Sequence, residues 1–192
     1  IAALQTPEAI AGFLASSYAK GQTYVSGFGP SPDFKDSNVN IAYASQAGLG
    51  LPDRSYYFDE KHAGVRDAYL AHIANVLKLA GADEATAAAQ AKDVMAFETR
   101  LASVSQSSEE LSRDVSLYYN PVSVADADAM TPNFKWSSFF AAQGLDAPAM
   151  FSLAQPDFHK EVSAMLADVP AATWQAYLRY QTIDSVSPFL SD

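Results

Sequence analysis

Apolar residues recur along most of the chain at steps of three and four, the spacing that places side chains on one face of an α-helix. This pattern predicts a long helix from about Glu60 to Ala80 that ends before Gly81, and an alanine-rich helix that Asp83 caps and that runs to about Val104. Because so few residues separate them, the two helices are expected to form an antiparallel hairpin. Its buried face is expected to hold Val65, Tyr69, Ile73, Val76 and Leu77 from the first helix and Val94, Phe97, Leu101 and Val104 from the second.

Start and stop signals predict shorter helices on both sides of this hairpin. Thr6 followed by Pro7 marks the start of an N-terminal helix that Gly21 can close. Each later start carries a capping residue or a proline at its first position. These starts are Ser108-Glu109-Glu110 before Leu111, Ser123 before a helix to Met130, Asn133 before a helix over Phe134–Gln143, Pro156-Asp157 before a helix to about Ala167, and Pro170 before the last helix, which carries Trp174, Tyr177 and Leu178.

Two segments near the N-terminus depart from the helical period. Residues 23–28 and 39–44 are rich in β-branched and aromatic residues and flank a Gly/Pro/Asp turn, which predicts a β-hairpin with Gly27-Phe28-Gly29 at its bend. The fold class is therefore mainly α: a multi-helix domain with a long antiparallel helical hairpin and one small β-hairpin. A chain of this length buries about 70% of its unfolded surface, so residues 1–192 are expected to form a single helical domain.

The amino-acid composition argues against several kinds of binding partner for this chain. Twelve basic and twenty-two acidic residues give a net charge of −10, which disfavours binding to nucleic acid or to an anionic membrane surface. No stretch approaches the ~20 apolar residues of a membrane span, and no signal segment is visible. Cysteine is absent, so neither a disulfide framework nor a thiolate metal site is expected. No contact with nucleic acid or membrane is predicted for this segment.

The histidines do not predict a metal site. A metalloprotease zinc site needs two histidines one helical turn apart with a carboxylate between them. His62, His72 and His159 are ten and eighty-seven residues apart, so they are interpreted as surface or half-buried helical residues. The sequence predicts no catalytic, cofactor-binding or metal-binding residue in this chain.

Other catalytic patterns are also missing from the sequence. No G-x-S-x-G elbow accompanies the serines, and three scattered histidines do not make a triad. The aspartates at positions 33, 36, 53 and 59 fit neither a calcium-loop spacing nor an identifiable carboxylate pair. They are interpreted as caps and solvated charges.

The sequence GLGLPDRSYYF at residues 48–58 predicts a structural turn that is anchored by aromatic side chains. Pro52 fixes its own φ angle, and Gly48 and Gly50 permit backbone angles that are closed to other residues. Asp53 is placed to start a turn or to cap a short helix. Arg54 can pair with Asp53 or Asp59, and one of Tyr56 and Tyr57 is expected to enter the core. A direct substrate contact from this segment is the alternative.

A second segment, from Arg113 to Pro121, leaves two interpretations open. An arginine can clamp a carboxylate, and the tyrosines with Asn120 can line a peptide-binding chamber. Alternatively, Arg113 ties down a loop while Tyr118 and Tyr119 pack and Asn-Pro makes a turn. If these segments face substrate, Arg54 and Arg113 are the predicted contacts.

Six motifs follow one another in a fixed order. They are Asp33-Phe34-Lys35-Asp36-Ser37, Gly48 to Tyr57, Glu98 to Ala102, Arg113-Asp114 with Tyr119-Asn120-Pro121, Pro132 to Trp136, and Trp174 to Leu178. They resemble the D-x-K-N-S, GLGLPxRxYY, E-x-x-L-A, R-D…Y-N, P-x-F-x-W and W-x-x-Y-L elements of the neprilysin and endothelin-converting-enzyme family of zinc metalloendopeptidases, with Asp36 where asparagine is usual. The resemblance covers roughly residues 6 to 190, and the absence of cysteine points to the bacterial members.

In that family the HExxH zinc motif and the ExxxD glutamate belong to a C-terminal domain, which has no counterpart here. The resemblance therefore implies the helical N-terminal domain of an exported, periplasmic or secreted, zinc endopeptidase. Such a domain caps the zinc domain and walls a chamber that admits peptides. Because the chain begins at Ile1 and stops at Asp192, it is interpreted as a fragment of a longer polypeptide, and this chain alone is expected to be inactive.

Two alternatives belong to other classes. The first is a free-standing helical binding or scaffold module of peptidase ancestry without a catalytic partner. The second is an enzyme of its own, such as a carboxylate-dependent hydrolase. For the first alternative, the parent reading frame would end near Asp192 without a zinc domain. For the second, the chain would have an activity that survives removal of zinc.

Overall fold

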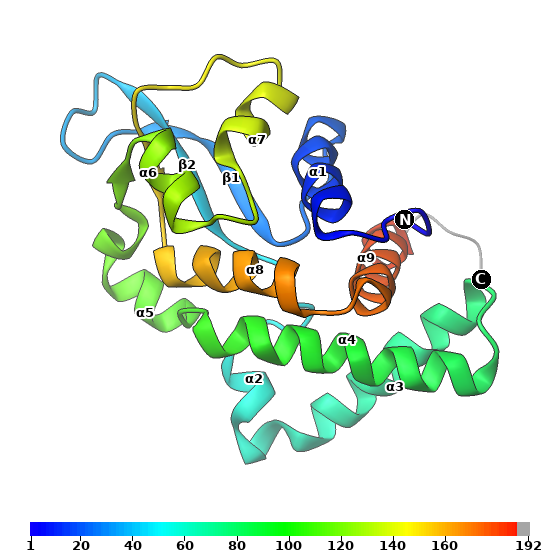
Figure 1. Cartoon of the computed structure of the whole chain (residues 1–192). Coiled ribbons are helices and arrows are strands. Elements are labelled where there is room, and N and C mark those ends of the chain that lie inside the picture. Colours follow the sequence, from blue (N-terminus) through cyan, green and yellow to red (C-terminus); the bar gives the residue numbers. More distant parts are fainter. Residues whose placement is uncertain (188–192) are drawn as a thin grey trace.

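The computed structural model describes residues 1–187, and it is mainly α with a small sheet (Figure 1). The predicted domain 1–192 also includes residues 188–192, which lie outside the described residues. The helices are α1 (Pro7–Ser17), α2 (Ser55–Phe58), α3 (Ala63–Leu79), α4 (Glu84–Val104), α5 (Ser108–Arg113), α6 (Val124–Met130), α7 (Trp136–Ala142), α8 (Pro156–Asp168) and α9 (Ala171–Val186). The strands are β1 (Ser26–Pro32), β2 (Asn40–Gln46), β3 (Pro121–Val122) and β4 (Phe151–Leu153), and short 3₁₀ turns span Tyr18–Lys20, Glu60–His62 and Val115–Tyr118.

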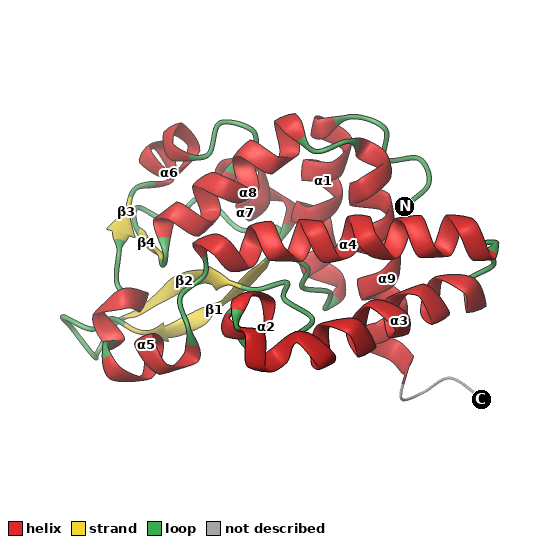
Figure 2. Ribbon diagram, turned by 90° about the horizontal axis from the view of Figure 1, so that it is seen from below, coloured by secondary structure: helices red, strands yellow, loops and turns green. Residues whose placement is uncertain are grey.

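The predicted helical hairpin is formed by α3 and α4, which run side by side in both views (Figures 1 and 2). Asp83 caps α4 by accepting the backbone N–H of Thr86 at 2.9 Å. Ile73 and most of the predicted face are buried, but Val65 is 42% exposed. The prediction for Val65 was wrong because eight residues at 3.6 per turn place it about 80° around the helix from Ile73.

The predicted β-hairpin is present, but its strands begin and end one to four residues later than expected. β1 and β2 pair antiparallel from Ser26↔Gln46 to Pro32↔Asn40. The bend therefore falls after Pro32, and Gly27 to Gly29 lie within β1 rather than at the turn. The hairpin is also part of a four-stranded sheet in the order β1-β2-β4-β3. Strands of two and three residues such as β3 and β4 are too short to show an alternating pattern.

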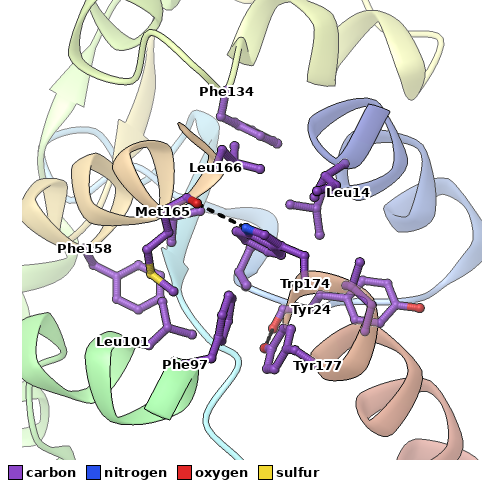
Figure 3. Close-up of a cluster of buried hydrophobic side chains, with 14 of the residues drawn as sticks. Leu14, Tyr24, Phe97, Leu101, Phe134, Phe158, Met165, Leu166, Trp174 and Tyr177 are labelled. Atoms are coloured by element: carbon purple, nitrogen blue, oxygen red, sulfur yellow. Dashed lines mark hydrogen bonds between the residues drawn. The ribbon is translucent and has the colours of Figure 1, made fainter. Parts of the chain in front are cut away.

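Aromatic side chains from α4 and α9 fill the core beside α8 (Figure 3). Phe97 stacks on Tyr177 with ring centroids 4.2 Å apart and meets Trp174 edge-on at 4.6 Å. The indole Nε1 of Trp174 donates to the carbonyl of Met165 at 3.1 Å. Since that hydrogen bond satisfies the one polar atom of the indole, the ring is buried without an unpaired donor.

Capping residues set the starts of α1, α5 and α6. Thr6 accepts the N–H of Ala9 at the start of α1, and Ser123 caps α6 as predicted. α5 begins at Ser108, three residues before the predicted start near Leu111, because Ser107 and Glu110 form a capping box.

Asn133 does not cap a helix as predicted. α7 begins at Trp136, and the Asn133 side-chain amide instead donates to the carbonyl of Ser163 in α8 at 2.8 Å. A capping residue that finds a partner in a neighbouring helix gives the same sequence signal as a true cap.

Candidate functional site

Segment 48–58 is anchored to α4 through one fully buried carboxylate. Glu98 has no exposed surface, and its Oε2 accepts the N–H of Gly50 at 3.2 Å and the hydroxyl of Tyr57 at 2.7 Å. Tyr69 from α3 donates to the same carboxylate at 2.9 Å, and Gln181 from α9 donates to Oε1 at 3.0 Å. Four donors, from segment 48–58, α3 and α9, therefore converge on Glu98.

Burial governs the protonation of this cluster. Removal from water raises the pKa of Glu98 to about 7, although the donors around the carboxylate act in the opposite direction. Burial also raises the pKa of Tyr57 and Tyr69, so both hydroxyls remain protonated and able to donate. A carboxyl group with a pKa near neutrality is a candidate general base. Because Glu98 is enclosed by protein donors, its role here is that of an anchor for segment 48–58.

The two glycines of GLGLP are required by geometry. Gly48 has φ of +94°, and a side chain at this position would also lie 2.5 Å from the carbonyl of Tyr24. A Cβ on Gly50 would overlap the hydroxyl of Tyr69 and lie 3.2 Å from Oε2 of Glu98. The absence of a side chain at Gly50 thus lets the backbone of the motif contact Glu98 and Tyr69.

Arg54 contacts protein groups that the sequence did not indicate. Its Nε donates to the carbonyl of Ala102 at 3.2 Å, and its guanidinium lies 5.8 Å from the centre of the Phe58 ring. Asp59 pairs with Lys61, and Asp53 accepts backbone N–H groups, so the predicted pairing of Arg54 with either aspartate was wrong. The carbonyl at the end of α4 is a neutral acceptor that a charge pattern cannot reveal.

Asp53 joins segment 48–58 to the start of α5. Its carboxylate accepts the N–H of Ser55 at 2.9 Å and the N–H of Ser108 at 2.7 Å, as expected of a turn and capping residue. Asp36 similarly accepts the N–H of Asn38 within its own loop. These contacts confirm the interpretation of these aspartates as caps.

Arg113 does not tie down a neighbouring loop. Its side chain is 77% exposed and pairs with Glu109 one turn earlier in α5, at 2.6 Å. An exposed pair of this kind adds little stability. Asn120 and Pro121 also differ from the predicted turn, since Asn120 donates to the carbonyl of Leu153 and Pro121 begins β3.

Two further motifs meet at the end of the β1–β2 hairpin. Tyr119 donates its hydroxyl to Asp33 at 2.7 Å, and its ring stacks on Phe34 at 5.3 Å. Tyr43 completes this group, 5.7 Å from Phe34, and Lys35 lies over the Tyr119 ring. Phe34 is 51% exposed, and we refer to Phe34, Tyr43 and Tyr119 as the aromatic tip.

The three histidines occupy different environments. His62 stacks on Tyr56 at 3.9 Å, and His72 contacts Asp184 at 2.7 Å. His159 is buried, which lowers its pKa to about 4 and corrects the prediction of a surface or half-buried residue. In residues 1–187 no group of three or more metal-ligating side chains gathers closely enough to hold a metal ion.

Comparison of the chain with known proteins decides the family. Residues 2–192 match the profile of the N-terminal region of peptidase family M13. The chain belongs to peptidase family M13. It is 29% identical over 168 residues to endothelin-converting enzyme 1 of Cavia porcellus, which covers 83% of this chain and 22% of that protein. It is 30% identical to endothelin-converting enzyme-like 1 of Rattus norvegicus, with 83% and 21% covered.

Solved structures show the same fold for this M13 chain. The Mycobacterium tuberculosis zinc metalloprotease Zmp1, in complex with an inhibitor, has a TM-score of 0.91 and 30% identity and covers 99% of this chain and 29% of that one. PepO from Lactobacillus rhamnosis has a TM-score of 0.81 at 19% identity, with 100% and 30% covered, and supports the fold alone. The M13 chain thus spans less than a third of the length of these relatives. Among residues 1–187, no helix has both the length and the apolar character needed to span a membrane.

Two pairs of M13 motifs contact each other, 48–57 with 98–102 and 33–37 with Tyr119, and Glu98 was the residue that sequence reasoning undervalued. It lies between Val94, Phe97 and Leu101, so it falls on the predicted buried face of α4. A lone carboxylate on such a face signals a buried cluster of donors. His159 carries a similar signal, since Phe158 and Val162 beside it are buried.

Proposed function

We propose that this chain is the non-catalytic N-terminal domain of a zinc-dependent M13 endopeptidase that hydrolyses peptide bonds. In this role it caps the zinc-bearing domain and forms part of the wall of a peptide-admitting chamber. The observation that carries the proposal is that 99% of the chain superposes on only 29% of Zmp1, a protein described as a zinc metalloprotease. The metal ligands would then belong to the remaining part of the parent protein.

The remaining features of the parent are part of the same proposal. Its cofactor would be zinc, bound outside this chain, and its substrates would be peptides. The absence of cysteine and the likeness to mycobacterial Zmp1 support a bacterial, exported parent. The partner of the chain would be its own zinc-bearing domain.

Arg54 and Arg113 remain proposed contacts with peptide in the chamber. Arg113 is extended into solvent, and its only described ion pair is the exposed one with Glu109. Arg54 uses Nε for the carbonyl of Ala102, which leaves the outer nitrogens of its guanidinium for a further acceptor. An arginine with free outer nitrogens can bind a peptide carboxylate in a bidentate way.

The aromatic tip is the surface that we propose to face the zinc-bearing domain. It is formed where two family motifs meet, yet Phe34 remains half exposed in the isolated chain. Exposed aromatic side chains held in a fixed arrangement are typical of interface centres. More than two thirds of the length of the relatives lies outside this chain, which gives the tip a partner of sufficient size.

A comparison of residues 1–192 with the longer parent protein tests the function. The parent is expected to bind one zinc ion and to cleave short peptides but not folded proteins, whereas residues 1–192 are expected neither to bind zinc nor to cleave peptides. Stoichiometric zinc or peptide cleavage in residues 1–192 would refute the proposal. A parent reading frame that ends near residue 192 would instead favour a free-standing binding module.

A further inference from the structure

Two buried polar atoms near β1 have no hydrogen-bond partner within the described residues. They are the indole Nε1 of Trp136 and the imidazole Nε2 of His159. Trp136 is 1% exposed and His159 is 3% exposed, so neither atom can reach bulk solvent. The two rings are perpendicular, with centroids 5.4 Å apart, and no direct hydrogen bond joins them. Buried polar groups in proteins are almost always paired, so both atoms require a partner.

Both side chains line one small cavity. Its volume, counted as the space open to the centre of a water molecule, is about 10 Å³. A cavity needs roughly 10–15 Å³ by this measure to hold one water. The remaining lining residues are Val25, Ser26, Thr131, Phe134 and Val162. An adjoining cavity of about 20 Å³ is lined by the exposed Thr23, which gives water a route in, and it shares four lining residues with the first: Val25, Ser26, Phe134 and Trp136.

The chemistry of the lining suits water. The indole of Trp136 can only donate. Burial keeps His159 neutral, and its Nδ1 faces the hydroxyl of Ser26 at 3.5 Å. A proton on Nδ1 leaves Nε2 as an acceptor. The hydroxyl of Thr131 donates toward the carbonyls of Ala127 and Phe134, so its lone pairs remain for a third hydrogen bond.

We propose that this cavity is a binding site for one ordered water molecule, which accepts the N–H of Trp136 and donates to Nε2 of His159. Its second hydrogen is directed to Thr131. The water joins Trp136, the first residue of α7, to His159 in α8, and it satisfies both unpaired atoms. With three protein partners, it has the bonding typical of conserved internal waters. The site is independent of the proposed peptidase role.

The two tryptophans of the chain provide a matched experiment. Trp174 is equally buried, but its indole N–H donates to the carbonyl of Met165. Magnetisation transfer from water to the two indole protons is measured by NMR on residues 1–192. The signals are assigned through their aromatic neighbours, Phe151 for Trp136 and Phe97 for Trp174, so no substitution is needed.

The expected result is a cross-peak of a bound water at the Trp136 indole proton and none at the Trp174 indole proton. The ¹⁵N shifts of His159 are expected to show a protonated Nδ1 and a hydrogen-bonded, unprotonated Nε2. A Trp136 indole without a water cross-peak, equal cross-peaks at both indoles, or a proton on Nε2 at neutral pH would each overturn the proposal.

Discussion

Gly50 lacks a side chain because the hydroxyl of Tyr69 and the carboxylate of Glu98 occupy the space that one would need. The same contact lets the backbone N–H of Gly50 reach Glu98 at 3.2 Å. A residue that resembles a simple turn former is therefore fixed by a tertiary contact. Gly64, at the start of α3, has no atom within 4 Å of the corresponding position and so has no such constraint.

We expect Gly50→Ala to destabilise the chain by roughly 2–4 kcal/mol, because the methyl group displaces Tyr69 and weakens the hydrogen bonds to Glu98. Gly64→Ala is the matched control and should leave stability unchanged or slightly higher, since alanine favours a helix. Urea unfolding followed by circular dichroism measures both. Equal stabilities for the two variants would contradict the overlap at Gly50.

Glu98 and His159 should give opposite pH dependences of stability. The pKa of Glu98 is raised in the folded state, so its contribution is present at pH 4.5 and is lost as pH rises toward about 7. The pKa of His159 is lowered to about 4, so its contribution is present above pH 6.5 and is lost as pH falls toward 4. Between pH 4.5 and 6.5 the two effects oppose each other in the native chain.

We therefore expect Glu98→Gln to be more destabilising at pH 5 than at pH 7, by on the order of 2 kcal/mol. For His159→Gln the difference should have the opposite sign. Free energies of unfolding at the two pH values measure both, and the remaining carboxylates cancel in each comparison with the unsubstituted chain. A destabilisation by Glu98→Gln that is the same at both pH values would show that Glu98 does not titrate in this range.

At the scale of elements, segment 48–58 connects helices that are distant in sequence. It reaches α4 through Glu98, and α9 holds its start through Tyr177, whose hydroxyl lies 2.9 Å from the carbonyl of Gly48 and 3.1 Å from that of Tyr24. Loss of this hydroxyl would remove the single donor that the two carbonyls share. The segment is thus the common support of the hairpin helices and the last helix.

Tyr177→Phe is expected to cost about 1–3 kcal/mol, because it removes a buried donor and keeps the packed ring. Tyr56→Phe is the control, since Tyr56 is only half buried and its hydroxyl has no partner among the described hydrogen bonds. Hydrogen exchange of the Leu51 amide, which is bonded to Tyr57, should quicken in Tyr177→Phe alone. An unchanged exchange rate of the Leu51 amide in Tyr177→Phe would show that the Tyr177 hydroxyl does not stabilise the segment.

Most helices could be predicted because their signals are local. Asp83 and Ser123 cap the helices that directly follow them. The spacing of apolar residues within a helix does not depend on which element the helix packs against. Asn133 misled the prediction because its partner, Ser163, is thirty residues away. β3 and β4 were missed for a similar reason, since strands of two and three residues are defined by their neighbours.

At the scale of the whole molecule, the aromatic tip and the α3–α4 turn lie at opposite ends (Figures 1 and 2). Phe34 at the tip and Leu79 near the turn are both exposed apolar residues, at 51% and 88%. The proposed function assigns the tip, and not the turn, to the contact with the zinc-bearing domain. The two residues therefore form a matched pair for testing the orientation of the chain in its parent.

We expect Phe34→Ser to weaken binding between residues 1–192 and a separately produced zinc-bearing domain at least about tenfold, as for a central interface residue. Leu79→Ser should change the dissociation constant less than about twofold, since exposed positions outside an interface contribute little. Isothermal titration calorimetry measures both. Equal affinities for Phe34→Ser and the unsubstituted chain would place the tip outside the interface while leaving the peptidase role intact.

The sequence by itself determined the mainly helical class, the α3–α4 hairpin, the caps of α1, α4 and α6, and the family. Each of these depends on spacing or on motif order, which are properties of the chain alone. Only the tertiary structure decided that the GLGLP segment is held by Glu98, that Arg54 binds a carbonyl, and that Asn133 binds α8 instead of capping a helix. Each of these depends on which distant backbone or side-chain atom becomes a neighbour, and such partners leave no periodic trace in the sequence.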